Sequence, residues 1–158
     1  MKGAIIFLLL AYTSAVAQDL QLVKATKQTI NHGASPTSTT NYKVTIKKEK
    51  GCNWAIDSVI NVYTQKSNEF NVFKVVDPTV LSSQYQSVKS FKKKDKGLFQ
   101  ITFASMKNRG SGRPGTPQDL MVPVADFTQG AIIYYTMGKK KKQLLVESFE
   151  EQETINAP

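Results

Sequence analysis

The chain has little of the side-chain chemistry on which most enzymes and metal proteins depend. Its 158 residues include one cysteine, Cys52, one histidine, His32, and two arginines. One cysteine cannot form an intrachain disulfide, so the fold must be held together by a hydrophobic core. A zinc site needs several His, Cys or carboxylate ligands, and a Ser-His-Asp triad could form only around His32. We therefore expect no metal site, no cofactor and no enzymatic activity.

Cys52 and His32 have simple expected roles. A lone cysteine is most often a small buried hydrophobe, and Cys52 is expected to be either that or half of an intermolecular disulfide. His32 is followed by Gly33 and, after two more residues, by Pro36, which are turn residues. We expect His32 to be an exposed turn histidine.

A glycine-rich stretch matches a nucleotide-binding pattern without its structural context. Residues 110–115 fit G-x-G-x-x-G, which in dinucleotide-binding folds lies between a strand and the start of a helix. Thr116 and Pro117 follow, and no helical periodicity surrounds them. We expect a loop here and no nucleotide cofactor.

Long hydrophobic runs are absent from the chain. A membrane-spanning helix needs about 20 apolar residues, whereas the apolar run at residues 4–11 has about eight and the one at 130–137 suits a strand. The first run follows Lys2 and precedes Ala15-Val16-Ala17, an A-x-A site. This pattern predicts a signal peptide over residues 1–17, cleaved between Ala17 and Gln18. With no Asn-x-Ser/Thr site and no disulfide framework, it indicates a secreted protein of the bacterial periplasm or cell surface, with no transmembrane segment after cleavage.

The remainder of the chain shows short runs of alternating apolar and polar residues, separated by turn residues, which is typical of an all-β domain. Tyr42, Val44 and Ile46 are the clearest case, because lysines and threonine alternate with them. The expected strands are 20–30, 42–48, 54–64, 70–76, 98–105, 131–137 and 143–149. Two further candidates are 81–91, whose spacing also suits a helical face, and 120–127, where Pro123 allows only an edge strand.

These strands predict a single antiparallel β-sandwich over residues 18–149, with immunoglobulin-like architecture and about 7–8 strands. A small lipocalin-like β-barrel is the alternative. Residues 35–41 are expected to be a connection, and a turn at 95–97 is expected to join its flanking strands as a hairpin. A second hairpin is expected around Gly138-Lys139, followed by a frayed polar tail at 150–158.

Charge is strongly one-sided, with a formal net charge of +9. Lysines gather at residues 47–50, 92–96 and 139–142, each beside a turn signal. Such clusters either keep turns solvated and discourage edge pairing, or form a face for anionic partners. The partners this indicates are an anionic envelope polymer or a protein that adds a strand to a β-edge, and nucleic acid is disfavoured.

The loop at residues 106–119 is the best candidate for a binding site. It contains Arg109 and Arg113, the two arginines of the chain, together with Lys107. The planar guanidinium of arginine suits carboxylate, sulfate and phosphate groups, and loops on β-scaffolds often carry function. The simpler alternative is a solvated loop.

The sequence therefore favours a non-catalytic binding or assembly role for an exported domain. Two alternatives remain at this point. A barrel would hold an apolar ligand in a dry cavity lined by Phe99, Ile101 and Phe103. An enzyme acting on polysaccharide would need two carboxylates facing each other across a cleft, for which Asp57 and Asp126 are available.

Overall fold

The computed structural model describes residues 20–33, 37–49, 51–65, 67–75, 87, 90–108 and 126–157. Within these ranges the protein is all-β, with eleven strands and no helix. None of the described segments forms a helix long and apolar enough to cross a membrane. The predicted signal peptide, Arg109 and Arg113 lie outside the described residues.

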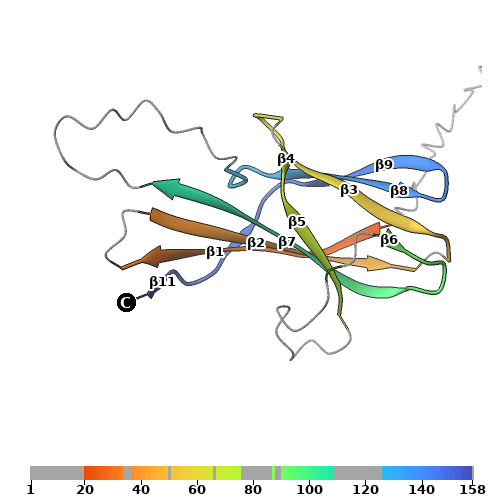
Figure 1. Cartoon of the computed structure of the whole chain (residues 1–158), viewed down its shortest axis with the longest axis horizontal. Coiled ribbons are helices and arrows are strands. Elements are labelled where there is room, and N and C mark those ends of the chain that lie inside the picture. Colours follow the sequence, from red (N-terminus) through yellow and green to blue (C-terminus); the bar gives the residue numbers. More distant parts are fainter. Residues whose placement is uncertain are drawn as a thin grey trace, which may run out of the picture.

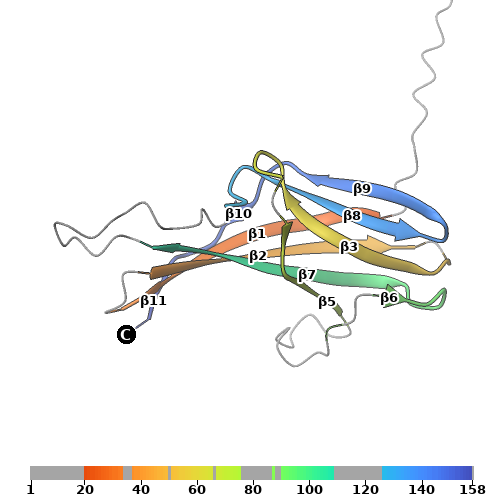
Figure 2. The same cartoon turned by 45° about the horizontal axis from the view of Figure 1, so that its top comes forward.

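The strands form two sheets that lie one above the other (Figures 1 and 2). Sheet A has six strands in the order β10-β1-β2-β7-β5, with β11 also pairing with β1. Its members are β1 (Leu20–His32), β2 (Thr37–Lys48), β5 (Phe70–Lys74), β7 (Gly97–Asn108), β10 (Glu150–Glu151) and β11 (Ile155–Ala157).

Sheet B has five strands in the order β4-β3-β8-β9, with β6 also pairing with β3. Its members are β3 (Trp54–Asn61), β4 (Ser67–Asn68), β6 (Ser90–Phe91), β8 (Ala131–Met137) and β9 (Lys140–Val146). Strand β3 has neighbouring strands on both sides, as expected for a run with apolar residues at both odd and even positions.

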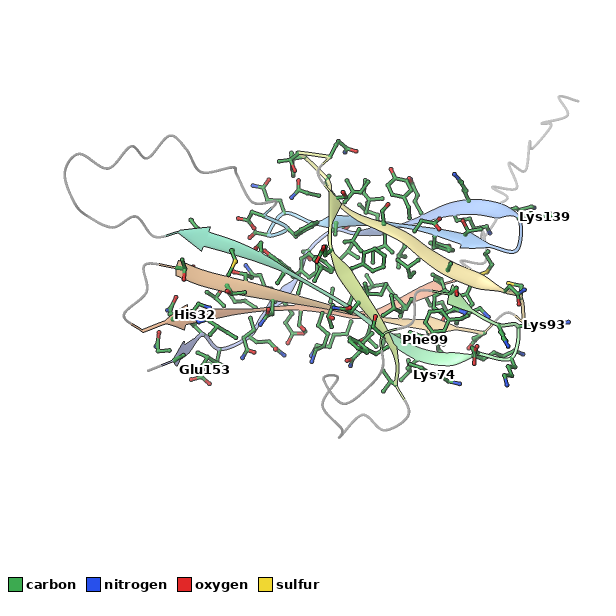
Figure 3. The ribbon with its side chains drawn as sticks, viewed as in Figure 1. His32, Lys74, Lys93, Phe99, Lys139 and Glu153 are labelled. Carbon is green, nitrogen blue, oxygen red and sulfur yellow. The ribbon has the colours of Figure 1, made fainter. Side chains whose placement is uncertain are left out.

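The core fills the space between the sheets. Val44 on β2 lies opposite Ile101 on β7, and both are fully buried because alternate residues of a strand point to one face. Phe99, labelled in Figure 3, is also fully buried and packs edge-on against Trp54 of sheet B, with ring centroids 4.7 Å apart. The expectation of an all-β, two-layer domain is confirmed.

The barrel alternative is wrong. A barrel needs one sheet closed on itself, whereas the described strands form two separate sheets. Phe99, Ile101 and Phe103 belong to a filled core, where Phe103 stacks on Tyr42 at 5.2 Å, and they do not line a dry cavity.

Strand β2 begins earlier than predicted. The expected connection includes Thr37 to Asn41, yet all of these residues pair with β7, and Ser38 to Asn41 also pair with β1. Figures 1 and 2 show that β1, β2 and β7 extend past sheet B at this end. An extension that leaves the core does not need apolar residues, so the alternation that marks a half-buried strand is missing.

The turn at residues 95–97 does not join a hairpin. Strand β6 on one side belongs to sheet B, and β7 on the other side belongs to sheet A, so the turn crosses between the layers. The link from β2 to β3 crosses in the same way. The hairpin of β8 and β9 is confirmed, and Gly138 in its turn has a φ of 62°, which favours glycine.

The end of the chain is paired and not frayed. Strands β10 and β11 lie parallel to β1 and cover its edge. The acidic residues at the start of the tail therefore meet lysines of β1, with Glu150 3.1 Å from Lys24 and Glu151 3.5 Å from Lys27. The exposed Lys24–Glu150 pair contributes only about 0.2–1 kcal/mol, so backbone pairing is the main contact that holds the segment.

Candidate functional site

Three lysine-bearing segments that are far apart in the sequence meet at one end of the sandwich. They are the end of β2, the turn between β6 and β7, and the hairpin turn of β8 and β9. Figure 3 shows Lys93 and Lys139 together at this end, while His32 and Glu153 lie at the opposite end. We call this surface the lysine-rich end, defined by Lys47, Lys48, Lys92, Lys93, Lys94, Lys96, Lys139, Lys140, Lys141 and Lys142.

Direct contacts hold the three segments together. The Lys48 Nζ donates a hydrogen bond to the Asp95 carbonyl oxygen at 3.3 Å, which links β2 to the turn before β7. A Cβ added to Gly51 would lie 3.4 Å from Cε of Lys96, so that lysine packs over the β2–β3 link. The Gly138 N–H donates to the Asn53 carbonyl oxygen at 2.8 Å and joins the β8–β9 turn to the same link.

Few carboxylates offset this positive charge. Among residues 47–49, 92–96 and 139–142 there are ten lysines and two acids, Glu49 and Asp95. Glu49 lies 2.6 Å from Lys47, whose hydrogen bond and charge lower the pKa of the carboxyl group. The Asp95 carboxylate accepts from the Lys92 backbone N–H at 2.9 Å. Most of the lysines at this end are exposed, so their charges face solvent.

Lys48 differs from the other lysines of this end. Its residue surface is 0% exposed, and its Nζ lies 5.8 Å from the Trp54 ring centroid. Burial lowers the pKa of Lys48, because the charged form loses hydration. Lys48 therefore supports the architecture of the lysine-rich end, while its exposed neighbours are available to a partner.

The predicted loop site is only partly placed. Lys107 is exposed near the end of β7, and its carbonyl oxygen accepts a hydrogen bond from Ser38 Oγ at 3.5 Å. Because β7 begins at the lysine-rich end and runs away from it, Lys107 belongs to the far end of sheet A. Arg109 and Arg113 lie outside the described residues, so their convergence with Lys107 stays a prediction.

The single histidine and cysteine stand apart from each other in the fold. The expectation of an exposed turn histidine is wrong, because His32 is the last residue of β1 and is half-buried, with its Nε2 2.9 Å from Thr39 Oγ1. Cys52 is half-buried, has a free thiol, and packs against the core beside the β2–β3 link. No three His, Cys, Asp or Glu side chains in the described ranges come together as a metal site would require.

The two carboxylates considered for hydrolysis serve local structure. Asp57 accepts a hydrogen bond from Thr136 Oγ1 at 2.8 Å, across the pairing of β3 and β8. The Asp126 Oδ1 accepts from the Tyr42 hydroxyl at 3.0 Å and from the Thr128 backbone N–H at 2.9 Å. Neither carboxylate lines the pocket on sheet A around Lys43 and Asn71 or the pocket beside Trp54 and Phe91.

The electrostatics of Asp126 follow from this geometry. Burial by itself would raise the pKa of Asp126, but hydrogen bonds from Thr128 and from the Tyr42 hydroxyl outweigh it, with help from the charge of Lys107. The net result is a lowered pKa for Asp126. The pKa of Tyr42 is raised, mainly because its ring and hydroxyl are buried.

Each lysine cluster can be identified in the sequence, but their meeting at one end of the fold cannot. The missing information was which turns cross between the sheets, because two such crossings bring residues 48–53 and 92–96 to the same end. The nearest signal was the position of every cluster beside a turn. No protein-family model, no curated protein and no solved structure matches the chain.

Proposed function

We propose that the mature protein is an exported, non-catalytic binding domain that holds an anionic polymer of the cell envelope through the lysine-rich end. The observation that carries the proposal is the convergence of three segments on one end of the sandwich, whose described residues include ten lysines and two acids. Clustered charge of one sign attracts opposite charge and raises its local concentration at the surface.

Rigid strands and interlayer contacts support this role. The lysines extend from turns whose backbones are tied to one another, so the cluster is maintained without a bound partner. Lysine side chains are compact, strongly hydrated charges that suit a flexible polyanion better than a shaped pocket. An acidic polysaccharide meets this requirement, since it repeats a negative charge along a solvated chain.

Export and an immunoglobulin-like strand arrangement are parts of the same proposal. The A-x-A pattern before Gln18 supports secretion to the periplasm or cell surface. The two-layer, all-β architecture is compatible with immunoglobulin-like topology. Amino-terminal sequencing of the exported protein is expected to begin at Gln18, and an intact Met1 in the cytoplasm would count against export.

Binding to an alginate column tests the lysine-rich end. The variant Lys93→Gln/Lys94→Gln/Lys139→Gln removes three exposed charges from it, and Lys24→Gln/Lys43→Gln/Lys107→Gln removes three exposed charges elsewhere. Each lysine near an anionic surface is worth about 1 kcal/mol, so the first variant should bind about a hundredfold more weakly. The second should elute close to the native protein.

The pattern of elution separates three explanations. Weakening confined to the first variant supports the lysine-rich end. Equal weakening of both variants shows that only net charge matters and contradicts a defined surface. Weakening confined to the second variant moves the site to the far end of sheet A, where Lys107 lies, and favours the loop at residues 106–119.

A further inference from the structure

The solvent-facing side of sheet A carries a groove that the lysine-rich end does not include. Its cavity volume is about 750 Å³. Thr26, Lys43, Thr102 and Asn71 lie side by side across its floor, one from each of β1, β2, β7 and β5. Four adjacent strands span about 14 Å at the usual spacing, so the floor is broad enough for several linked rings.

Segments at both edges of the sheet line the groove. On the β1 side Gln152 lines it, and the Gln152 N–H donates to the Lys27 carbonyl oxygen at 2.9 Å. On the other side Glu69 and β5 line it, with Phe73 half-buried. The C-terminal pairing with β1 therefore completes one edge of the groove.

The groove presents exposed side-chain amide groups. The side chains of Asn41, Asn71 and Gln152 are exposed and form no hydrogen bond within the described part of the chain. Each side-chain amide offers two N–H donors and an acceptor oxygen. A ligand whose groups both donate and accept would satisfy them, as the hydroxyl groups of a sugar do.

Apolar side chains lie beside these amides. Phe73 and Met106 line the same groove, and Met106 is 59% exposed. Phenylalanine offers a flat apolar face that can cover the C–H groups of a sugar ring, while the amides take its hydroxyl groups.

Charge excludes an acidic ligand in the groove. Among its lining residues there is one cation, Lys43, and one anion, Glu69, so the formal charges cancel. A lipid or other wholly apolar ligand is also excluded, because it would leave Asn41 and Asn71 without partners on binding. What remains is a neutral ligand rich in hydroxyl groups.

We infer that this groove binds a neutral oligosaccharide segment, independently of the anionic polymer proposed for the lysine-rich end. Asn41, Asn71 and Gln152 supply the hydrogen bonds, and Phe73 supplies the apolar surface. The protein would thus have two binding surfaces with different ligand chemistry, one charged and one neutral.

An array of neutral oligosaccharides tests the inference, with acidic oligosaccharides and extended peptides on the same array. Asn41→Ala/Asn71→Ala is the test variant, and Gln21→Ala/Gln143→Ala is the matched control, because those two amides are exposed and do not line the groove. Loss of two hydrogen bonds should weaken binding to the recognised neutral glycan by about 30-fold. The control should bind like the native protein, and all variants should unfold at the same denaturant concentration.

Sodium chloride distinguishes this site from the lysine-rich end. Binding in a neutral groove should be unchanged at 0.5 M salt, whereas binding to alginate should be lost. Absence of binding to every neutral oligosaccharide overturns the inference, as does equal binding by the test variant. Retention of acidic oligosaccharides or peptides alone also overturns it, since the occupant would then belong to another class.

Discussion

The hydroxyl group of Tyr42 joins several segments at the edge of the core through hydrogen bonds, so its removal tests the structure directly. It donates to Asp126 Oδ1 at 3.0 Å and accepts from the Phe127 N–H at 3.3 Å and from Ser105 Oγ at 3.4 Å. Tyr42 itself is 1% exposed and Phe127 is 0% exposed, so water does not replace these bonds easily.

Tyr42→Phe deletes the hydroxyl group and keeps the ring. The stacking on Phe103 at 5.2 Å should persist, so the change measures the polar contacts alone. A buried N–H that loses its partner costs about 1–3 kcal/mol, while the exposed Asp126 carboxylate can recover hydration. We expect a loss of about 2 kcal/mol in the free energy of unfolding, or about 6 °C in Tm for a domain of this size.

Urea unfolding at pH 7 measures the loss, and Tyr63→Phe is the control because Tyr63 is 70% exposed. The control should stay within about 0.5 kcal/mol of the native protein. The slope of the unfolding free energy against urea concentration should be the same in all three proteins. If Tyr42→Phe is no less stable than Tyr63→Phe, the hydrogen-bond cluster does not exist as described.

The same variant predicts a change with pH. The lowered pKa of Asp126 adds stability above the ordinary pKa of an aspartate, and this contribution is lost as pH falls through the folded-state value. Removing the Tyr42 hydroxyl raises that folded-state pKa toward the ordinary value. The stability difference between native protein and Tyr42→Phe should therefore shrink between pH 5 and pH 3, and a constant difference would contradict the role assigned to Asp126.

Two further substitutions test the packing at each end of the sandwich. Lys48→Met should leave stability unchanged or raise it by about 1 kcal/mol at pH 7, since a buried charge is replaced by an apolar side chain of similar size. Because burial lowers the pKa of Lys48, the free energy of unfolding of the native protein should rise relative to that of the variant as pH rises toward 10.5. Urea unfolding at pH 7 and pH 10 measures this difference. Gly130→Ala should destabilise by more than about 2 kcal/mol, because its φ is 119° and an added Cβ would lie 2.6 Å from the Val146 carbonyl oxygen. Gly138→Ala is the comparison, with a φ of 62° and no atom within 4 Å, and equal losses by thermal unfolding would refute the close approach at Gly130.

Strands that face the core could be predicted from the sequence. Tyr42, Val44 and Ile46 alternate with polar residues because one face of β2 is buried and the other is wet. Thr37 to Asn41 belong to the same strand but lie where sheet A extends past sheet B. Hydrophobic periodicity reports burial and not strand pairing, so this part of β2 was assigned to a connection.

Layer assignment could not be predicted from local pattern. Asp95, Lys96 and Gly97 form a turn in either a hairpin or a crossing between sheets. The choice depends on Trp54 stacking on Phe91 at 4.3 Å, which keeps β6 in sheet B while β7 joins sheet A. The lysine-rich end follows from that long-range contact, which explains why the clusters were found and their meeting was not.

The groove on sheet A could not be predicted from the sequence for a related reason. Asn41, Thr102 and Asn71 are unremarkable in sequence, and they come together only because β2, β7 and β5 are neighbours. Arg109 and Arg113 attracted attention through composition alone. Composition identifies residue types that are rare in the chain, whereas a binding surface on a sheet can consist of common residue types that strand pairing brings side by side.

The pairing of β1 with β10 and β11 has a consequence for how the protein acquires its fold. Thr26 meets Glu150, and Ile30 meets Ile155, so the first strand of sheet A acquires its outer neighbours only after synthesis has passed residue 155. Ordering between such remote partners carries a large entropic barrier and slows folding. The outer edge of sheet A therefore cannot be completed until residues 150–157 have been synthesised, whereas the pairings of β2 with β7 and of β3 with β8 do not depend on that segment.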